Sequence, residues 1–318
     1  MFEHILIPLD GSPLAECVLP HAVALAQAFG SRITLLQALE RGPTAGRARS
    51  VDPLVWHLRK AEAEAYLGGL AARLRKLGFR TESRLLEGQA AEQIIEFARG
   101  HDVELIILSS HGRSGLSRWN ISSVVQKIIL RAYMPVMIVR AYQPCAGELG
   151  SLRYRRLLVP LDGSQRAECV LPLATALARF HGSQLLLAHL VCRPEIPRRV
   201  PLTQEEMELV SELTERNRLV ASSYLEQIRS QVSVDVESRL LVSDDIAATL
   251  HDLVEQEDVA MVVLGAHGYS GRTKWPYGSV ALSFIVYGTT PLLIVQDLCQ
   301  EEVERTRAEV AATEFKGH

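Results

Sequence analysis

The 318-residue sequence has few cysteines and no long apolar run, and these two absences exclude two classes of protein. Five cysteines, none in a C-x-x-C pair, are too few for a small secreted domain held together by disulfides. Val259–Ala266, among the longest apolar segments, has eight residues, whereas a membrane-spanning helix needs roughly 20. The N-terminal Met-Phe-Glu-His segment also lacks a secretory pattern. We therefore expect a reduced, cytoplasmic protein with no membrane partner.

The chain also has little net charge. Its 34 Lys and Arg residues and 37 Asp and Glu residues give a formal net charge of −3. This balance provides no overall attraction for nucleic acid, so we expect no nucleic-acid partner. The G-x4-G-K-[ST] phosphate loop is absent as well. The sequence therefore lacks the lysine that neutralises a transferred phosphate in NTPases of that class.

The strongest positive feature is an internal repeat. Residues 8–20 read PLDGSPLAECVLP, and residues 160–172 read PLDGSQRAECVLP. The repeat is too long for a solenoid unit of roughly 20–50 residues and indicates a duplicated domain. We predict a first domain at residues 1–142, a linker at 143–152 and a second domain at 153–298. Residues 299–318 are predicted to form a charged, helical tail.

Strand-like and helix-like segments alternate in each copy. In the first copy, strands are predicted at residues 4–9, 32–39, 79–86, 103–108 and 135–139, and helices at residues 12–28, 53–77, 90–98 and 122–132. In the second copy, strands are predicted at residues 156–161, 184–191, 233–241, 259–264 and 292–295, and helices at residues 167–180, 203–230, 246–254 and 279–287. This order predicts an α/β fold: two tandem, Rossmann-like domains, each an open sheet of five parallel strands with helices on both faces.

Open parallel sheets bind ligands outside the carboxyl ends of their strands. After the fourth strand of the second copy, Gly265 and Gly268 are followed by nine residues and then by Gly278 and Ser279, a G-x2-G-x9-G-S pattern. Glycine lets phosphate oxygens approach the backbone and allows a positive φ angle. The N–H groups of a helix beginning at Ser279 would favour an anion. The loop therefore predicts a phosphate site.

This loop, the Pro160-Leu161-Asp162 turn and the closing Pro291–Val295 strand resemble the universal stress protein family. The resemblance covers nearly the whole chain, twice, as in a tandem member. It implies the adenine-nucleotide alpha hydrolase-like fold, ATP bound across the first and fourth strands, and a role in surviving stress. It also implies an internal pseudo-dimer through the last strands of the two domains, with pairing of chains into a homodimer as a further option.

The resemblance also implies which residues of the second domain contact the nucleotide. Pro160 and Asp162 would lie beside the nucleoside, and Leu190 would touch the adenine. The ribose and phosphates would be held by Leu264, Gly265, His267, Gly268, Gly278, Ser279 and Val280. The ligand would be ATP, ADP or AMP, with Mg²⁺ as an option beside Asp162. We expect no catalytic residue and no metal site formed by the protein alone.

The first domain departs from this pattern. Pro8, Asp10 and Gly112 are retained. Ser109 stands where the second copy has Gly265, and Ser122 stands where it has Gly278. Ser123 follows Ser122. We expect weaker nucleotide binding there, because serine adds a Cβ and costs energy at positive φ.

Plainer interpretations of these residues stay open. Asp10 and Asp162 are also residue types that cap turns, and His111 and His267 could simply form local hydrogen bonds. Three functions therefore stand: a largely non-catalytic, nucleotide-binding stress regulator; a slow ATPase or nucleotidyl-transfer enzyme that uses His267 or Asp162 as its base; and an interaction scaffold with a vestigial nucleotide site.

Overall fold

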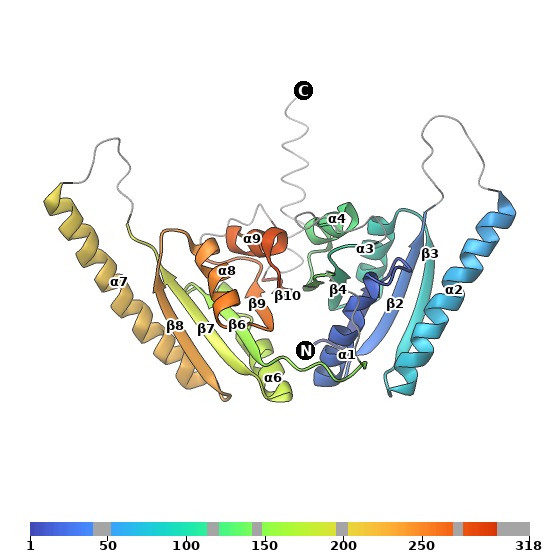
Figure 1. The fold of residues 1–318 in the computed structure, drawn as a ribbon, viewed down its shortest axis with the longest axis horizontal. Helices are drawn as coiled ribbons and strands as arrows, with labels where there is room; N and C mark the ends of the chain where they lie inside the picture. Colours follow the sequence, from blue (N-terminus) through green and yellow to red (C-terminus); the bar gives the residue numbers. More distant parts are fainter. Residues whose placement is uncertain (41–51, 113–120, 142–147, 195–202, 270–275, 298–318) are drawn as a thin grey trace, which may run out of the picture. The chain divides into compact units, whose positions relative to one another are not determined.

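The computed structural model describes residues 1–40, 52–112, 121–141, 148–194, 203–269 and 276–297 (Figure 1). Contacts between residues divide the chain into two compact units, Met1–Leu152 and Arg153–His318, called domain 1 and domain 2 below. The first half of the predicted linker and the whole predicted tail lie outside the described residues. Among the described residues, no helix is both long and apolar enough to cross a bilayer.

Domain 1 alternates strands and helices along its whole length. Its elements are β1 His4–Pro8, η1 Ala15–Cys17, α1 Val18–Phe29, β2 Arg32–Leu39, α2 Pro53–Lys76, β3 Thr81–Glu87, α3 Ala90–Gly100, β4 Leu105–Ser109, α4 Ser123–Ala132 and β5 Val136–Val139. The strand order is β3-β2-β1-β4-β5, and every pairing in this domain is parallel.

Domain 2 repeats this arrangement. Its elements are β6 Arg156–Leu161, α5 Gln165–Glu168, α6 Leu171–His181, β7 Gln184–Val191, α7 Gln204–Gln231, β8 Val236–Val242, α8 Ile246–Gln256, β9 Met261–Gly265, α9 Ser279–Tyr287 and β10 Leu292–Val295. Its strand order is β8-β7-β6-β9-β10, again with parallel pairings. The predicted fold of two tandem five-stranded parallel sheets is confirmed.

The strand order decides where the helices lie. The chain places β2 and β3 on one side of β1, and then β4 and β5 on its other side. Because parallel crossovers are right-handed, this change of side puts α1 and α2 on one face of the sheet and α3 and α4 on the other. In domain 1, α2 packs on β2 and β3, and α3 packs on α4. The interior strand β4 is buried along its whole length, as its uninterrupted apolar sequence predicts.

Local sequence signals set the helix ends. Gly30 ends α1 at φ +70°, and Gly182 ends α6 at φ +66°, both in the left-handed conformation that glycine tolerates. Thr203 and Glu206 form a capping box at the start of α7. Helix α7 has 28 residues and α2 has 24. The offset between the two copies grows from 152 at Pro8 and Pro160 to 155 at Glu82 and Glu237, and the longer helix accounts for this growth.

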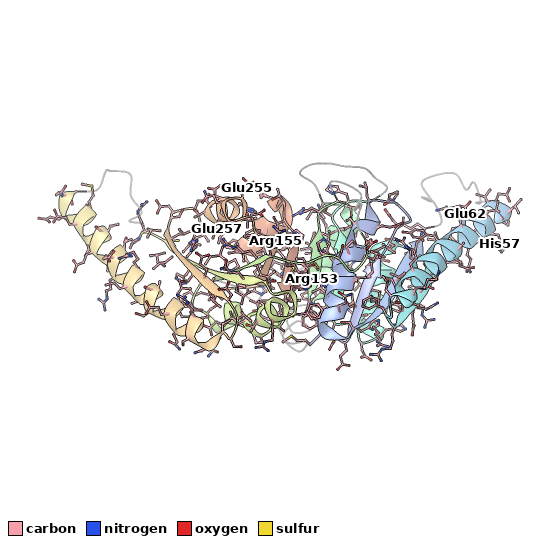
Figure 2. The ribbon with its side chains drawn as sticks, turned by 60° about the horizontal axis from the view of Figure 1, so that its bottom comes forward. His57, Glu62, Arg153, Arg155, Glu255 and Glu257 are labelled. Carbon is pink, nitrogen blue, oxygen red and sulfur yellow. The ribbon has the colours of Figure 1, made fainter. Side chains whose placement is uncertain are left out.

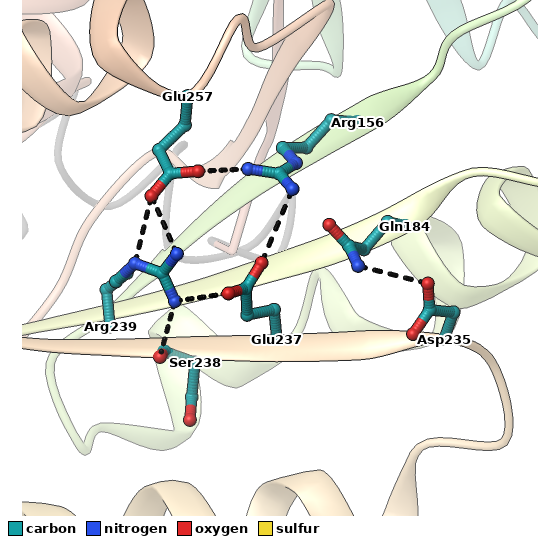
Figure 3. A network of polar contacts seen from close by, with 7 residues as sticks. All are labelled: Arg156, Gln184, Asp235, Glu237, Ser238, Arg239 and Glu257. Carbon is teal, nitrogen blue, oxygen red and sulfur yellow. Dashed lines mark hydrogen bonds and ion pairs between the residues drawn. The ribbon is translucent and has the colours of Figure 1, made fainter.

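Domain 2 also carries a network of charged side chains over β6 and β8 (Figure 3). Glu257, the residue that ends α8 (Figure 2), forms ion pairs with Arg156 and Arg239. Glu237 forms ion pairs with the same two arginines. The four side chains alternate in charge and are 18–34% exposed. The network therefore ties the end of α8 to two strands.

Candidate functional site

A cavity of about 160 Å³ lies in domain 2 at the carboxyl ends of β6 and β9. All ten residues predicted to contact a nucleotide in this domain line it: Pro160, Asp162, Leu190, Leu264, Gly265, His267, Gly268, Gly278, Ser279 and Val280. They come from β6, β7, β9, α9 and the turns that follow the strands. The fold thus brings together residues up to 120 positions apart in the sequence.

Asp162 holds the turn after β6 and also the loop after β9. Its Oδ1 accepts hydrogen bonds from the Ser164 N–H at 3.0 Å and the Ser164 hydroxyl at 2.6 Å. Its Oδ2 accepts the N–H of Tyr269 at 2.5 Å. The turn-capping interpretation of this aspartate is therefore correct, and a contact with ribose or a cation stays a prediction.

The glycines of the loop serve close packing. Neither Gly265 nor Gly268 is among the residues with positive φ, so the loop does not use the left-handed conformation that glycine allows. A Cβ on Gly268 would overlap the Asp162 Oδ2 atom. A Cβ on Gly265 would lie 3.0 Å from the Arg166 carbonyl oxygen and 3.2 Å from that of His267. The loop and the turn after β6 therefore leave no room for a side chain at Gly268 and only a tight fit for a Cβ at Gly265.

The amino terminus of α9 faces the same cavity. Gly278 is the N-cap, and no side chain in the described part of the chain caps the first turn of the helix. The Gly278 N–H donates to the Ala266 carbonyl at 2.7 Å, which fixes the helix start against the loop. Ser279, Val280 and Ala281, whose N–H groups form the first turn, line the cavity. Uncapped N–H groups and the helix dipole make this end of the cavity suited to an anion.

His267 has a carboxylate partner that the sequence analysis missed. Its Nδ1 lies 2.7 Å from Asp297 Oδ1, and the two side chains are 1% and 2% exposed. Arg166 Nε lies 3.4 Å from the other carboxylate oxygen of Asp297. An ionised carboxylate only accepts hydrogen bonds, so Asp297 fixes the proton of His267 on Nδ1. Thirty residues separate the pair, and only adjacency of β9 and β10 brings them together.

Domain 1 has an equivalent cavity of about 420 Å³. It is lined by all six residues predicted there: Pro8, Asp10, Ser109, Gly112, Ser122 and Ser123. The Asp10 turn repeats that of Asp162, since Asp10 Oδ1 accepts the Ser12 N–H at 2.9 Å and the Ser12 hydroxyl at 2.6 Å. A Cβ on Gly112 would overlap Asp10 Oδ2, so this glycine is retained for the same packing reason as Gly268.

Ser109 and Ser122 do not have the positive φ angle at which the sequence analysis expected serine to cost energy. The Ser109 hydroxyl donates to the His111 carbonyl at 2.6 Å and lies 3.3 Å from that of Leu14. These are the counterparts of the carbonyls that crowd Gly265, so Ser109 is engaged with the backbone and needs no positive φ. The Ser122 hydroxyl accepts the Val125 N–H at 3.3 Å and caps α4. In domain 1, therefore, one helix N–H is already occupied by protein.

The described residues that line the two cavities form no metal site of their own. Over the residues that the structure describes, no group of three or more His, Cys, Asp or Glu side chains is arranged to hold a metal ion. The optional Mg²⁺ would therefore have to be held by the phosphates together with Asp162, and it stays a prediction.

The family model described as "Universal stress protein family" matches residues 1–140 and again residues 153–296. The chain belongs to the universal stress protein family. The double match makes it a tandem member, as predicted from the repeat.

Named relatives agree with this assignment. A universal stress protein of Thermus aquaticus is 33% identical over 145 residues, which cover 44% of this chain and all of that protein. One from Methanocaldococcus jannaschii is 28% identical over 141 residues, which cover 44% of this chain and 83% of that protein. Universal stress protein Rv2005c of Mycobacterium tuberculosis is 25% identical over 222 residues, which cover 70% of each chain.

Solved structures support the fold. A universal stress protein from Archaeoglobus fulgidus has a TM-score of 0.66 at 17% identity, covering 93% of this chain and 99% of its own. A Pseudomonas aeruginosa protein described as functionally unknown has a TM-score of 0.70 at 15% identity, covering 98% of both chains. At these identities the likeness extends to the fold alone.

Proposed function

We propose that the cavity of domain 2 binds an adenine nucleotide and that the protein acts as a largely non-catalytic regulator of a stress response. The observation that carries this proposal is the convergence of the ten residues on one cavity that ends at an uncapped helix terminus. An apolar pocket with one anion-binding end suits a molecule with a flat ring and a phosphate chain.

The lining suggests how such a ligand would lie. Ala188, Leu190 and Ile246 form an apolar region that suits an adenine ring, and α9 lies at the other end. The phosphates would then face Ser279 and the N–H groups of the first turn of α9. Asp162 lies between the two regions, and it could accept a hydrogen bond from a ribose hydroxyl.

The test is a nucleotide titration of the full chain, together with mass spectrometry of any small molecule released on denaturation. Gly278→Val is the informative variant, because a Cβ there meets only ordinary contacts, 3.6 Å from Ala266 O and 3.7 Å from His267 Cα. We expect it to fold normally and to bind ATP at least tenfold more weakly, since a branched side chain would cover the helix terminus. Ser122→Val, at the equivalent position of domain 1, is the matched control. Unchanged ATP binding by Gly278→Val would contradict the proposal.

The Asp297–His267 pair favours a second candidate function, slow ATP hydrolysis. With the proton on Nδ1, the His267 Nε2 atom is the nitrogen that could accept a proton from an attacking water. Slow, steady ADP production that is lost in His267→Ala and reduced in Asp297→Asn would favour this candidate. ATP that stays intact for hours with Mg²⁺ would favour the non-catalytic role.

Three further statements remain predictions from the family resemblance. They are the pairing of the two domains through their last strands, the pairing of chains into a homodimer, and a cytoplasmic location. Size-exclusion chromatography with light scattering tests the second of these directly.

A further inference from the structure

The cavity of domain 1 contains a buried amide that its counterpart in domain 2 lacks. Gln37, near the end of β2, is 5% exposed, and its Oε1 has no hydrogen-bond partner among the described residues. Gln37 lines both the 420 Å³ cavity and an adjoining cavity of about 260 Å³ below α2, so it lies where the two meet. The equivalent residue of domain 2, His189, does not line the domain 2 cavity.

A second buried polar atom lines the same cavity. His111 is 5% exposed, its Nδ1 lies 2.9 Å from the Ser110 hydroxyl, and its Nε2 has no partner in the described part of the chain. Buried polar atoms in proteins are almost always hydrogen-bonded, to protein or to a bound molecule. Two such atoms around one cavity of this size therefore indicate a ligand that supplies their partners.

The phosphate end of this cavity is poorly suited to a phosphate chain. Ser122 already occupies the Val125 N–H, and Ser109 donates its hydroxyl to the His111 carbonyl. Two carboxylates, Asp10 and Glu40, line the cavity, against one guanidinium, Arg59, among the described lining residues. The described lining of the domain 2 cavity has one carboxylate, Asp162, and no Lys or Arg, so the two linings have the same formal charge, and what sets domain 1 apart for phosphates is its capped helix terminus.

The remaining wall of the cavity is apolar. Leu39, Ile94, Leu108 and Ile128 line it, and such a surface suits a flat heterocycle. The Oε1 of Gln37 needs a hydrogen-bond donor, such as a ring amino group, and a carboxylate such as Glu40 can accept from sugar hydroxyls. The ligand that fits is flat, uncharged and rich in donors.

We propose that domain 1 binds a nucleoside that carries no phosphate chain, through an acceptor site at Gln37. The two domains then recognise different ligands, a nucleoside in domain 1 and a nucleotide in domain 2. The proposal concerns domain 1 only and does not depend on whether domain 2 binds ATP.

The test is calorimetric titration of the full chain with adenosine. Gln37→Leu removes the acceptor, and it leaves folding intact because it replaces an unpaired buried polar group with an apolar one of similar size. We expect wild-type protein to bind adenosine and Gln37→Leu to bind it about tenfold more weakly, the effect of one lost hydrogen bond to a buried group. His189→Leu, at the equivalent strand position of domain 2, is the matched control and should bind adenosine as wild type does.

ATP titration of Gly278→Val separates this proposal from that for domain 2. With the domain 2 site covered, the chain should still bind adenosine and should bind ATP much more weakly than adenosine. Absence of adenosine binding by wild-type protein at millimolar concentration would overturn the proposal, since the cavity would then hold water only. Equal loss of adenosine binding in Gln37→Leu and His189→Leu, or ATP binding as tight as adenosine binding in Gly278→Val, would overturn it too.

Discussion

Substituting Glu257 with alanine should destabilise domain 2 substantially, because this carboxylate joins two arginines that are themselves partly buried. Its Oε1 accepts from Arg239 at 2.9 Å through Nε and lies 2.8 Å from Nη2, while its other oxygen pairs with Arg156 (Figure 3). The exposed fractions of the three side chains are 18% for Glu257, 25% for Arg156 and 33% for Arg239. Without Glu257, two guanidinium groups would share the single carboxylate of Glu237.

The size of the effect follows from this partial burial. Breaking a fully buried pair costs about 3–5 kcal/mol, whereas an exposed pair contributes about 0–1 kcal/mol. The two contacts of Arg239 with one oxygen of Glu257 and the intermediate exposure put the loss in free energy of unfolding at about 2 kcal/mol. For a unit of this size, that loss corresponds to a fall in melting temperature of about 4–8 °C.

Urea denaturation, followed by circular dichroism, would measure the change without adding salt. The matched control is Glu82→Ala in domain 1, at the strand position equivalent to Glu237. Glu82 pairs with Arg84 at 3.0 Å, but the two side chains are 59% and 54% exposed, so its loss should cost at most about 0.5 kcal/mol. If Glu257→Ala is as stable as wild type, or no less stable than Glu82→Ala, the network contributes no more than a surface pair and the reasoning is wrong.

Three other predictions concern single side chains. Burial lowers the pKa of His21 to about 4, so domain 1 should lose up to about 3 kcal/mol as the pH falls from 6.5 to 4, because the unfolded chain takes up the proton first; His21→Leu should flatten this part of the urea-midpoint profile. Ser122→Ala should cost domain 1 about 1 kcal/mol through loss of the α4 cap and Ser122→Gly only a few tenths; equal costs by thermal melting would refute a capping role. Burial, with a smaller effect from Asp297, raises the pKa of Cys169 to about 11, so Asp297→Asn should speed its alkylation at pH 8; an unchanged rate, read by mass spectrometry, would count against this.

Much of the fold could be predicted because its signals are local. The strands Arg156–Leu161 and Gln184–Val191 begin and end as predicted, because each is an apolar run bounded by turn residues. The third strand was predicted to begin at Phe79 and begins at Thr81. The Phe79 N–H donates to the Leu74 carbonyl at 3.2 Å, so the end of α2 holds this residue, and an apolar pattern does not reveal such a bond.

The first helix of each domain was predicted as one segment and is two. In domain 2, α5 ends at Glu168 and α6 begins at Leu171. Pro172 lies in the first turn of α6 and has no N–H to donate back to Glu168, so a continuous helix would lose that hydrogen bond. The repeated proline was visible in the sequence, and its position predicts the break.

The candidate site, like the fold, has parts that the sequence could predict and parts that it could not. The motif residues around Gly265 and Gly278 could be predicted because the loop and the helix that it starts are contiguous in sequence. Asp297 and Arg166 could not, because neither belongs to a motif: Asp297 reaches His267, and Arg166 reaches Asp297, only in the folded domain. The structure adds a reason for the glycines that the motif does not reveal, since their backbone is not left-handed and Asp162 and Arg166, on another segment, crowd the positions that a Cβ would take.

Comparison of the two domains indicates which features separate one ligand chemistry from another. The turns after β1 and β6 have nearly the same hydrogen bonds at Asp10 and Asp162, so the P-x-D turn cannot distinguish the two cavities. The distinction lies at the helix terminus, capped by Ser122 in one domain and left uncapped at Gly278 in the other. It lies also at the end of β2, where Gln37 provides a buried acceptor. In domain 1, Ser122 at one end of the cavity can thus exclude phosphates, and Gln37 at the other end can select a ligand with hydrogen-bond donors. The backbone that the two domains share keeps both positions in place.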